Sequence, residues 1–133
     1  MRMFAIVLIL CCTAQAKDLS PELRKKLLDS VTERREQSWD IARKIWNAAE
    51  PGYQEKTSSS LLADLLEDAG LKVQRSVANI PTAFTAEFGV EGPLIGILGE
   101  FDALPGLSQE AIPERAPREE GNGYGHGCGH HLF

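Results

Sequence analysis

The sequence LIGILGEFDALPG, residues 94–106, carries the strongest fold signal in this chain of 133 residues. Its first five residues, 94–98, form a compact apolar run that is typical of a strand covered on both faces of a sheet. Pro105 and Gly106 then favour a sharp turn. Two helical patterns and two strand patterns precede the run. This order of elements predicts an α/β fold, with two helices followed by a mixed sheet in a layered domain.

The first predicted helix spans residues 18–49. Ser20 is suited to its N-cap, and Pro21 stands at the first helical position, where a missing N–H costs nothing. Apolar residues recur in it at three- and four-residue steps, as on one face of an amphipathic helix. Residues 32–37 are polar all round, so we expect the middle of the helix to be solvated.

The second predicted helix spans about residues 57–69, with Thr57 or Ser58 as its cap. Four leucines form its apolar stripe. Gly70 is well placed to adopt the left-handed conformation that commonly follows a helix end.

The hydrophobic period changes after this helix. Residues 71–75 alternate between apolar and polar, which predicts a short half-buried strand, and residues 80–88 predict a second one. Residues 89–93 form a turn before the apolar run. Residues 107–120 are polar, contain prolines and lack periodicity. They predict a surface loop, with a flap over a site as the alternative.

Two carboxylates, Glu100 and Asp102, directly follow the apolar run. In open α/β sheets, binding sites form at the carboxyl ends of the strands. Residues one apart share a side of an extended chain, so both carboxylates should point the same way. A solvated loop after a strand is the alternative for this segment taken alone.

The chemistry is concentrated in residues 121–133 (GNGYGHGCGHHLF), which contain all three histidines and one cysteine. Imidazole and thiolate are the side chains that bind zinc best near neutral pH. The interleaved glycines let the backbone turn tightly. In an extended loop His126, Cys128 and His130 would share one side and His131 would point elsewhere. The tail therefore predicts half of a metal site.

Residues 1–16 have the features of a signal peptide, namely a basic start, a short apolar run and an A-x-A cleavage site. The run is too short for a transmembrane anchor. A buried N-terminal helix or strand is the alternative. Cleavage would leave residues 17–133 as a secreted or periplasmic chain and would remove Cys11 and Cys12. Cys128 would then be the single thiol, which favours a bound metal over a disulfide.

The overall composition bounds the function. The formal net charge of −5 argues against a nucleic-acid partner, which would favour a basic patch. A hydrophobic fraction of 43% and a charged fraction of 25% are typical of globular proteins. The length suits part or all of one domain.

Two motifs in this chain resemble peptidase family M20 in its amidohydrolase branch. They are EFDALPGLS at residues 100–108 and GHGCGHH at residues 125–131. The likeness is greatest to the p-aminobenzoyl-glutamate hydrolase and β-alanyl-lysine dipeptidase type. The segment EPGYQE at residues 50–55 is similar as well. The resemblance covers essentially residues 19–133.

The resemblance implies a zinc-exopeptidase-like, three-layer catalytic domain interrupted by a smaller dimerisation domain. It implies a dinuclear Zn²⁺ site, with Mn²⁺ or Co²⁺ as alternatives. Enzymes of this type use metal-activated water to cleave an amide bond of a dipeptide or an acyl-amino acid. A full-length relative is expected to form a homodimer.

Carried over by position, the resemblance makes Cys128 and His130 the metal ligands. Asp102 matches the aspartate that orients a ligand. Glu100 stands where many relatives have a ligating histidine, and its role stays open. The resemblance gives no clear role to His126, and none is assigned to His131.

The family's general-base glutamate and remaining ligands are expected further along than residue 133. We therefore expect this chain to be an N-terminal portion of the catalytic domain and to be inactive alone. The alternatives are a catalytically inactive secreted protein that binds a metal or a partner, and a structural zinc loop. The second is weaker, since such loops supply four ligands from nearby sequence.

Overall fold

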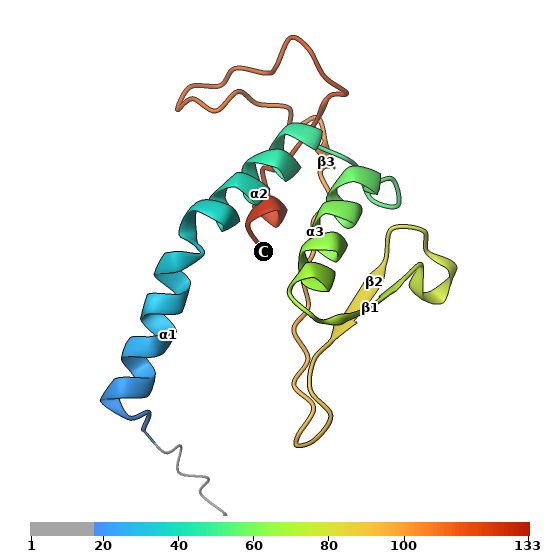
Figure 1. Ribbon diagram of the computed structural model, residues 1–133. Coiled ribbons are helices and arrows are strands. Elements are labelled where there is room, and N and C mark those ends of the chain that lie inside the picture. Colours follow the sequence, from blue (N-terminus) through green and yellow to red (C-terminus); the bar gives the residue numbers. More distant parts are fainter. Residues whose placement is uncertain (1–17) are drawn as a thin grey trace, which may run out of the picture. The chain divides into compact units, whose positions relative to one another are not determined.

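The computed structural model describes residues 18–133, so the predicted signal peptide lies outside the described residues. The described residues divide into two compact units, the first ending at Arg34 and the second spanning Arg35–Phe133. The described elements (Figure 1) are, in chain order, α1 (Pro21–Glu33), α2 (Arg35–Ala48), α3 (Lys56–Asp68), β1 (Lys72–Arg75), η1 (Val77–Asn79), β2 (Phe84–Glu87), β3 (Leu104–Pro105), β4 (Tyr124–Gly125) and η2 (His130–Leu132).

The first unit contributes α1. Its start is as predicted, because the Ser20 hydroxyl accepts a hydrogen bond from a first-turn N–H and Pro21 opens the helix. The prediction of one helix over residues 18–49 is wrong, since α1 ends at Glu33 and α2 begins separately. The Thr32 hydroxyl donates to the carbonyl of Leu28 at 2.9 Å. Such bonds compete with the helical hydrogen bonds, and residues 32–37, where the break occurs, carry no apolar side chain that could pack.

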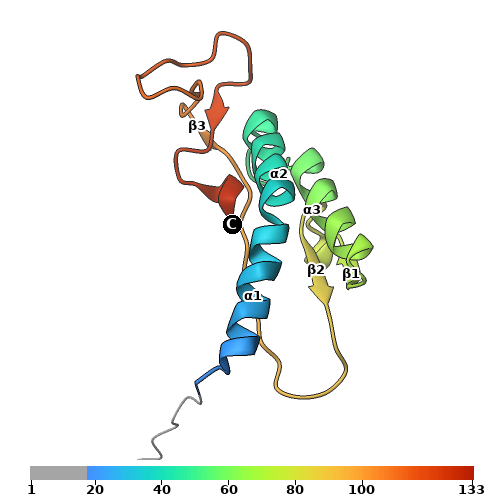
Figure 2. The ribbon, with the colours of Figure 1, turned by 60° about the vertical axis from the view of Figure 1, so that its left-hand side comes forward.

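In the second unit, α3 lies between α2 and the β1–β2 hairpin (Figures 1 and 2). Few apolar side chains are buried there, and they are Ala42, Ile45, Ala49, Ala63 and Ala103. Alanine buries little area, and burial contributes roughly 25 cal/mol per Å². Polar interactions between the elements therefore matter more here than in a domain with a large core.

The hairpin confirms the two predicted short strands. β1 and β2 pair antiparallel, with Val73 opposite Ala86, and the burial of β2 alternates along the strand. The second strand is shorter than the predicted 80–88, because η1 and a turn precede it. Arg75 on β1 makes ion pairs with Asp64 and Glu67 of α3, at 2.7 and 3.0 Å. These pairs are exposed and contribute little to stability.

The prediction of a buried strand at residues 94–98 is wrong. The run is extended but has no strand partner among residues 18–133, and Leu94 and Ile97 are 97% and 95% exposed. A strand buried on both faces needs neighbouring strands and covering layers, and the described part of the chain supplies neither. The predicted mixed sheet is replaced by two separate two-stranded antiparallel sheets. The α/β class itself is retained.

A carboxylate caps the start of α3 from outside the helix. Ala49 adopts a left-handed φ of 42° and ends α2, and Glu50 follows. The Glu50 carboxylate accepts from the N–H groups of Thr57 and Ser58, both at 2.8 Å, and from the Ser58 hydroxyl at 2.9 Å. The Glu50 carbonyl also accepts from the N–H of Ala103 at 2.7 Å. The predicted cap by Thr57 or Ser58 is wrong, because both are donors to Glu50.

The end of α3 is as predicted. Gly70 has a φ of 87°, and its N–H donates to the carbonyl of Glu67 at 2.9 Å. The next N–H, of Leu71, donates to the carbonyl of Leu66 at 3.0 Å. These two bonds form a Schellman motif, which satisfies carbonyls at the helix end.

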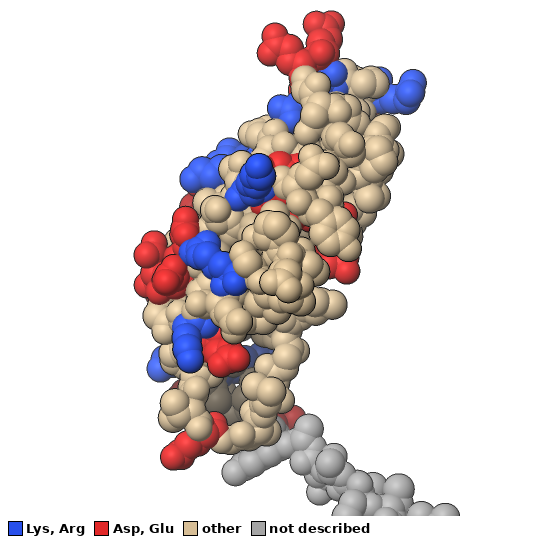
Figure 3. Space-filling view, turned by 90° about the vertical axis from the view of Figure 1, so that its right-hand side faces the viewer, with Lys and Arg blue, Asp and Glu red and all other residues tan. Residues whose placement is uncertain are grey.

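Surface charges of both signs are interspersed on the face shown in Figure 3. On α2, for example, Lys44 pairs with Asp40 at 2.7 Å. Among residues 18–133, no helix combines the length and the apolar character needed to cross a membrane.

Replacing Glu50 with Gln should lower the free energy of unfolding by about 1 kcal/mol at neutral pH, the usual cost of losing a helix cap. Burial raises the pKa of the Glu50 carboxyl, but hydrogen bonds from Ser58 and Thr57 outweigh it and leave the pKa below its ordinary value. The carboxylate's contribution is therefore present above the unfolded pKa and is lost as pH falls through the folded pKa.

Urea unfolding of the wild type and of Glu50→Gln between neutral and acidic pH measures this effect. The difference in stability should be largest at neutral pH and should close at the acidic end. Glu91→Gln, at an exposed loop position, serves as the control and should show no difference. A difference for Glu50→Gln that stays constant with pH would contradict the assignment.

Candidate functional site

A short antiparallel pair joins the two predicted chemical segments. β3 pairs with β4, with Leu104 opposite Gly125, and the N–H of Gly106 donates to the carbonyl of Gly123 at 3.0 Å. The carboxylates precede β3 and the Cys/His segment follows β4. The pairing therefore places residues 100–103 near residues 126–131, although the intervening loop is long.

Two glycines of the tail lie close against Leu107, and at Gly125 the main chain leaves no room for a side chain. A Cβ at Gly125 would overlap the carbonyl group of Leu107, and one at Gly127 would lie 2.9 Å from the Leu107 Cδ1. A third, Gly129, has a φ of 88°, which other residues rarely adopt. These glycines bring the backbone of the tail against Leu107 and then let it turn.

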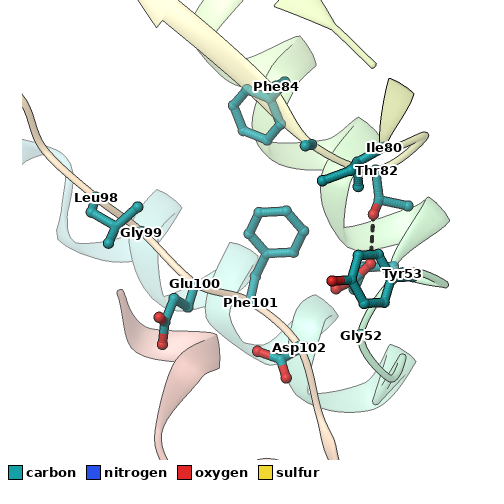
Figure 4. Close-up of a pocket in the computed structure, with 12 residues that line it drawn as sticks. Gly52, Tyr53, Ile80, Thr82, Phe84, Leu98, Gly99, Glu100, Phe101 and Asp102 are labelled. Atoms are coloured by element: carbon teal, nitrogen blue, oxygen red, sulfur yellow. Dashed lines mark hydrogen bonds between the residues drawn. The ribbon is translucent and has the colours of Figure 1, made fainter. Parts of the chain in front are cut away.

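His130 lies between the two carboxylates. Its Nδ1 is 2.7 Å from Oδ1 of Asp102, and its Nε2 is 3.0 Å from Oε2 of Glu100. This confirms that Glu100 and Asp102 share a side. Phe101, between them in sequence, points to the opposite side, toward the hairpin (Figure 4).

Two side-chain types that bind zinc, an imidazole and a carboxylate, lie side by side at Nε2 of His130. A carboxylate only accepts hydrogen bonds, so Asp102 holds the hydrogen on Nδ1 and leaves Nε2 for another partner. Ligands on neighbouring corners of a zinc tetrahedron lie roughly 3.3 Å apart. The distance between Nε2 of His130 and Oε2 of Glu100 is 3.0 Å, which is the spacing of an ion pair and is close to that of two zinc ligands.

Cys128 is exposed and lies in the turn before η2. Within residues 18–133, no group of three or more His, Cys, Asp or Glu side chains is close enough to hold a metal ion. His130 thus contacts Glu100 and Asp102 through its two ring nitrogens, while Cys128 does not lie with them.

The predicted common side for His126, Cys128 and His130 is wrong. His126 is only 3% exposed, and its Nε2 lies 3.1 Å from the carbonyl oxygen of Ile45 on α2. It thus faces α2, as His131 does. The segment is not extended, because the N–H of residue 129 donates to the His126 carbonyl at 3.0 Å and closes a turn.

Three rings gather where the tail meets α2. The centroid of the His131 ring is 4.9 Å from that of Trp46 and 5.2 Å from that of His126. Burial lowers the pKa of both His126 and His131, which favours the neutral form of each imidazole. The Nδ1 atoms of His126 and His131 are buried and have no hydrogen-bond partner among residues 18–133. Sequence reasoning left both residues without a role. The alternation of glycine and histidine over residues 125–127 was the available signal, since it indicates two differently packed sides.

A cavity of about 400 Å³ lies between the hairpin and residues 98–102 (Figure 4). Phe84 and Phe101 stack across it with centroids 6.0 Å apart, and the Thr82 hydroxyl donates to Glu55 at 2.7 Å on another wall. Neither His130 nor Cys128 lines it. Glu100 and Asp102 do line it, so the cavity adjoins the two carboxylates that flank His130.

Comparison with known proteins finds sequence similarity to hydrolases. One subunit of the p-aminobenzoyl-glutamate hydrolase of Escherichia coli (strain K12) is 43% identical over 112 residues, which are 84% of this chain and 23% of that protein. The thermostable carboxypeptidases 1 and 2 of Saccharolobus solfataricus are each 30% identical over 111 residues, which are 82% of this chain and 27% of each enzyme. No family profile matches the chain. The chain spans about a quarter of the length of these relatives.

The chain is thus homologous to a class of hydrolases and peptidases. The resemblance to the M20 amidohydrolase-like family is confirmed over the matched part.

Replacing Gly125 with Ala should destabilise the second unit by roughly 1–3 kcal/mol, because the added methyl group overlaps the Leu107 main chain. The β3–β4 pair would separate, and His130 would move away from Asp102. Thermal unfolding followed by circular dichroism measures the loss. Gly96→Ala is the matched control, since its Cβ meets nothing within 4 Å. Equal stability of the two variants would contradict the close approach.

Proposed function

We propose that this chain carries part of the metal site of a metal-dependent hydrolase, which cleaves an amide bond in a dipeptide or an acyl-amino acid. The main support is the arrangement of His130 between Glu100 and Asp102, in a chain homologous to amide and peptide hydrolases. Elements distant in sequence converge on one imidazole there.

In this proposal Cys128 and His130 hold the ion, with Zn²⁺ as the expected metal and Mn²⁺ or Co²⁺ as alternatives. Thiolate, imidazole and carboxylate together suit zinc, and Glu100 is placed to contribute a carboxylate oxygen. When bound, the ion would polarise an amide carbonyl and make water more acidic. A dinuclear site would need further ligands beyond those of residues 18–133.

Residues of this chain orient the proposed ligand His130. Asp102 fixes the ring of His130 through Nδ1, so that Nε2 faces Glu100. The β3–β4 pair fixes the separation of the two segments. No described residue has an assigned role in proton transfer to the amide. We therefore propose that the present chain alone does not turn over substrate.

The location of the protein and its assembly with other chains are also proposals. A signal peptide over residues 1–16 would direct it to the periplasm or outside the cell. A homodimer is expected from the family resemblance. The E. coli relative is by its name one subunit of a hydrolase, which supports an assembly of more than one chain.

A second candidate is an inactive secreted protein that binds a metal or a partner. Two observations favour it. Within residues 18–133 no three ligands are gathered, and the apolar side chains of the run 94–98 are exposed. Metal binding without any contribution to catalysis would favour this candidate.

Metal binding tests the site. The full chain, loaded with Zn²⁺ and dialysed, should retain metal by mass spectrometry, and Cys128→Ser with His130→Ala should retain none. Asp102→Asn should bind about 10–100-fold more weakly, since it loses the carboxylate that orients the ligand. Glu119→Gln, an exposed carboxylate in the loop, is the control and should bind as the wild type does. No metal in the wild type, or unchanged binding in the double variant, would refute the site.

A chimera tests the reaction. Residues 18–133 would replace the matched segment of the E. coli relative, and hydrolysis of p-aminobenzoyl-glutamate would be measured. The chimera should be active, and the same chimera with His130→Ala should lose activity. The chain by itself should show none with dipeptides and acyl-amino acids. An inactive but folded chimera would contradict the hydrolase proposal and favour the second candidate.

A further inference from the structure

We infer that His126 is a positioning residue, which fixes the turn bearing Cys128 and His130 to the end of α2. The inference rests on the proposed function for its effect on metal binding. The positioning itself depends only on the contacts of His126.

The segment entering the turn packs on two sides. Gly125 and Gly127 place bare backbone against Leu107, where no Cβ fits without displacing it. Between them, His126 points the other way and is buried against α2. The Gly-His-Gly sequence thus fixes the segment between a loop and a helix, with one side chain as the attachment.

The attachment needs a hydrogen-bond donor. The carbonyl oxygen of Ile45 lies in the last turn of α2 and already accepts from the N–H of Ala49 at 3.0 Å. A carbonyl oxygen can accept twice, and the Nε2–H of His126 at 3.1 Å supplies the second bond. Helix ends favour such donors, because their carbonyls carry the negative end of the helix dipole. With His126 3% exposed, water has little access to replace it.

The turn is held at both ends. At the start of the turn, His126 bonds to Ile45. Beyond the end of the turn, the ring of His131 packs edge-on against Trp46 of the same helix, α2. The His126 carbonyl accepts from the N–H of Gly129, which closes the turn. Cys128 lies inside this turn, and η2 begins directly after it at His130. A change in the position of His126 therefore moves both proposed ligands together.

Two amide side chains test the hydrogen bond in the full 133-residue chain. In His126→Gln the amide nitrogen can reach the place of Nε2 and keep the bond to Ile45. In His126→Asn the shorter amide reaches only the place of Nδ1, so the bond is lost while polarity is matched. His126→Phe keeps the volume without a donor and is the third variant.

Co²⁺ titration and amide hydrogen exchange are the measurements. The thiolate-to-Co²⁺ absorption band reports ligation by Cys128. His126→Asn and His126→Phe should bind Co²⁺ at least about tenfold more weakly, the usual effect of losing a group that supports a metal ligand. The Gly129 amide should exchange faster in both. His126→Gln should remain close to wild type, and exchange at Val73 in the hairpin should be unchanged in every folded variant.

The outcomes separate the two proposals. Wild-type affinity and exchange in His126→Asn would overturn the positioning role, and so would equal losses in the Gln and Asn variants. If the wild type gives no thiolate band, the metal proposal fails, and the Gly129 exchange rates of Gln and Asn still decide whether His126 positions the turn.

Discussion

The carboxylate of Glu50 is the interaction on which the second unit depends. It accepts three hydrogen bonds from the first turn of α3, while its own main chain bonds to Ala103 and lies two residues beyond the end of α2. One residue thus connects two helices and the segment that bears the carboxylates of the candidate site. The apolar core contains four alanines and one isoleucine. Such a core stabilises weakly, so charge-assisted bonds that orient the elements have a correspondingly larger effect.

The candidate site is attached to the same helix end twice. The main chain of Glu50 holds Ala103, which directly follows Asp102, and the carbonyl of Ile45 holds His126, which begins the Cys/His turn. The β3–β4 pair then closes the connection between the two attachments. His130 meets Asp102 and Glu100 because the segments that carry them are attached close together, one at Ile45 in the last turn of α2 and one at Glu50, two residues beyond its end.

The sequence predicted the features that depend on local signals. Ser20 and Pro21 start α1, Gly70 ends α3, and alternating residues form the hairpin. The sequence-based predictions were wrong where the structure of a segment depends on contacts with other segments. The run at residues 94–98 is apolar enough for a buried strand, but no described segment pairs with it. The split between α1 and α2 falls within the polar residues 32–37, where hydrophobic periodicity gives no signal for a boundary.

In the candidate site, too, local patterns were predictable and contacts between segments were not. The shared side of Glu100 and Asp102 was predictable from strand parity, and His130 was predictable as a ligand type. The direction of His126 was not, since it depends on a turn and on contact with α2. The proposed function requires that His130 and Cys128 hold one metal ion. X-ray absorption at the zinc edge of the loaded chain tests this most directly. The account predicts a sulfur neighbour at about 2.3 Å together with nitrogen or oxygen neighbours at about 2.0 Å. A spectrum with oxygen and nitrogen neighbours alone would contradict it.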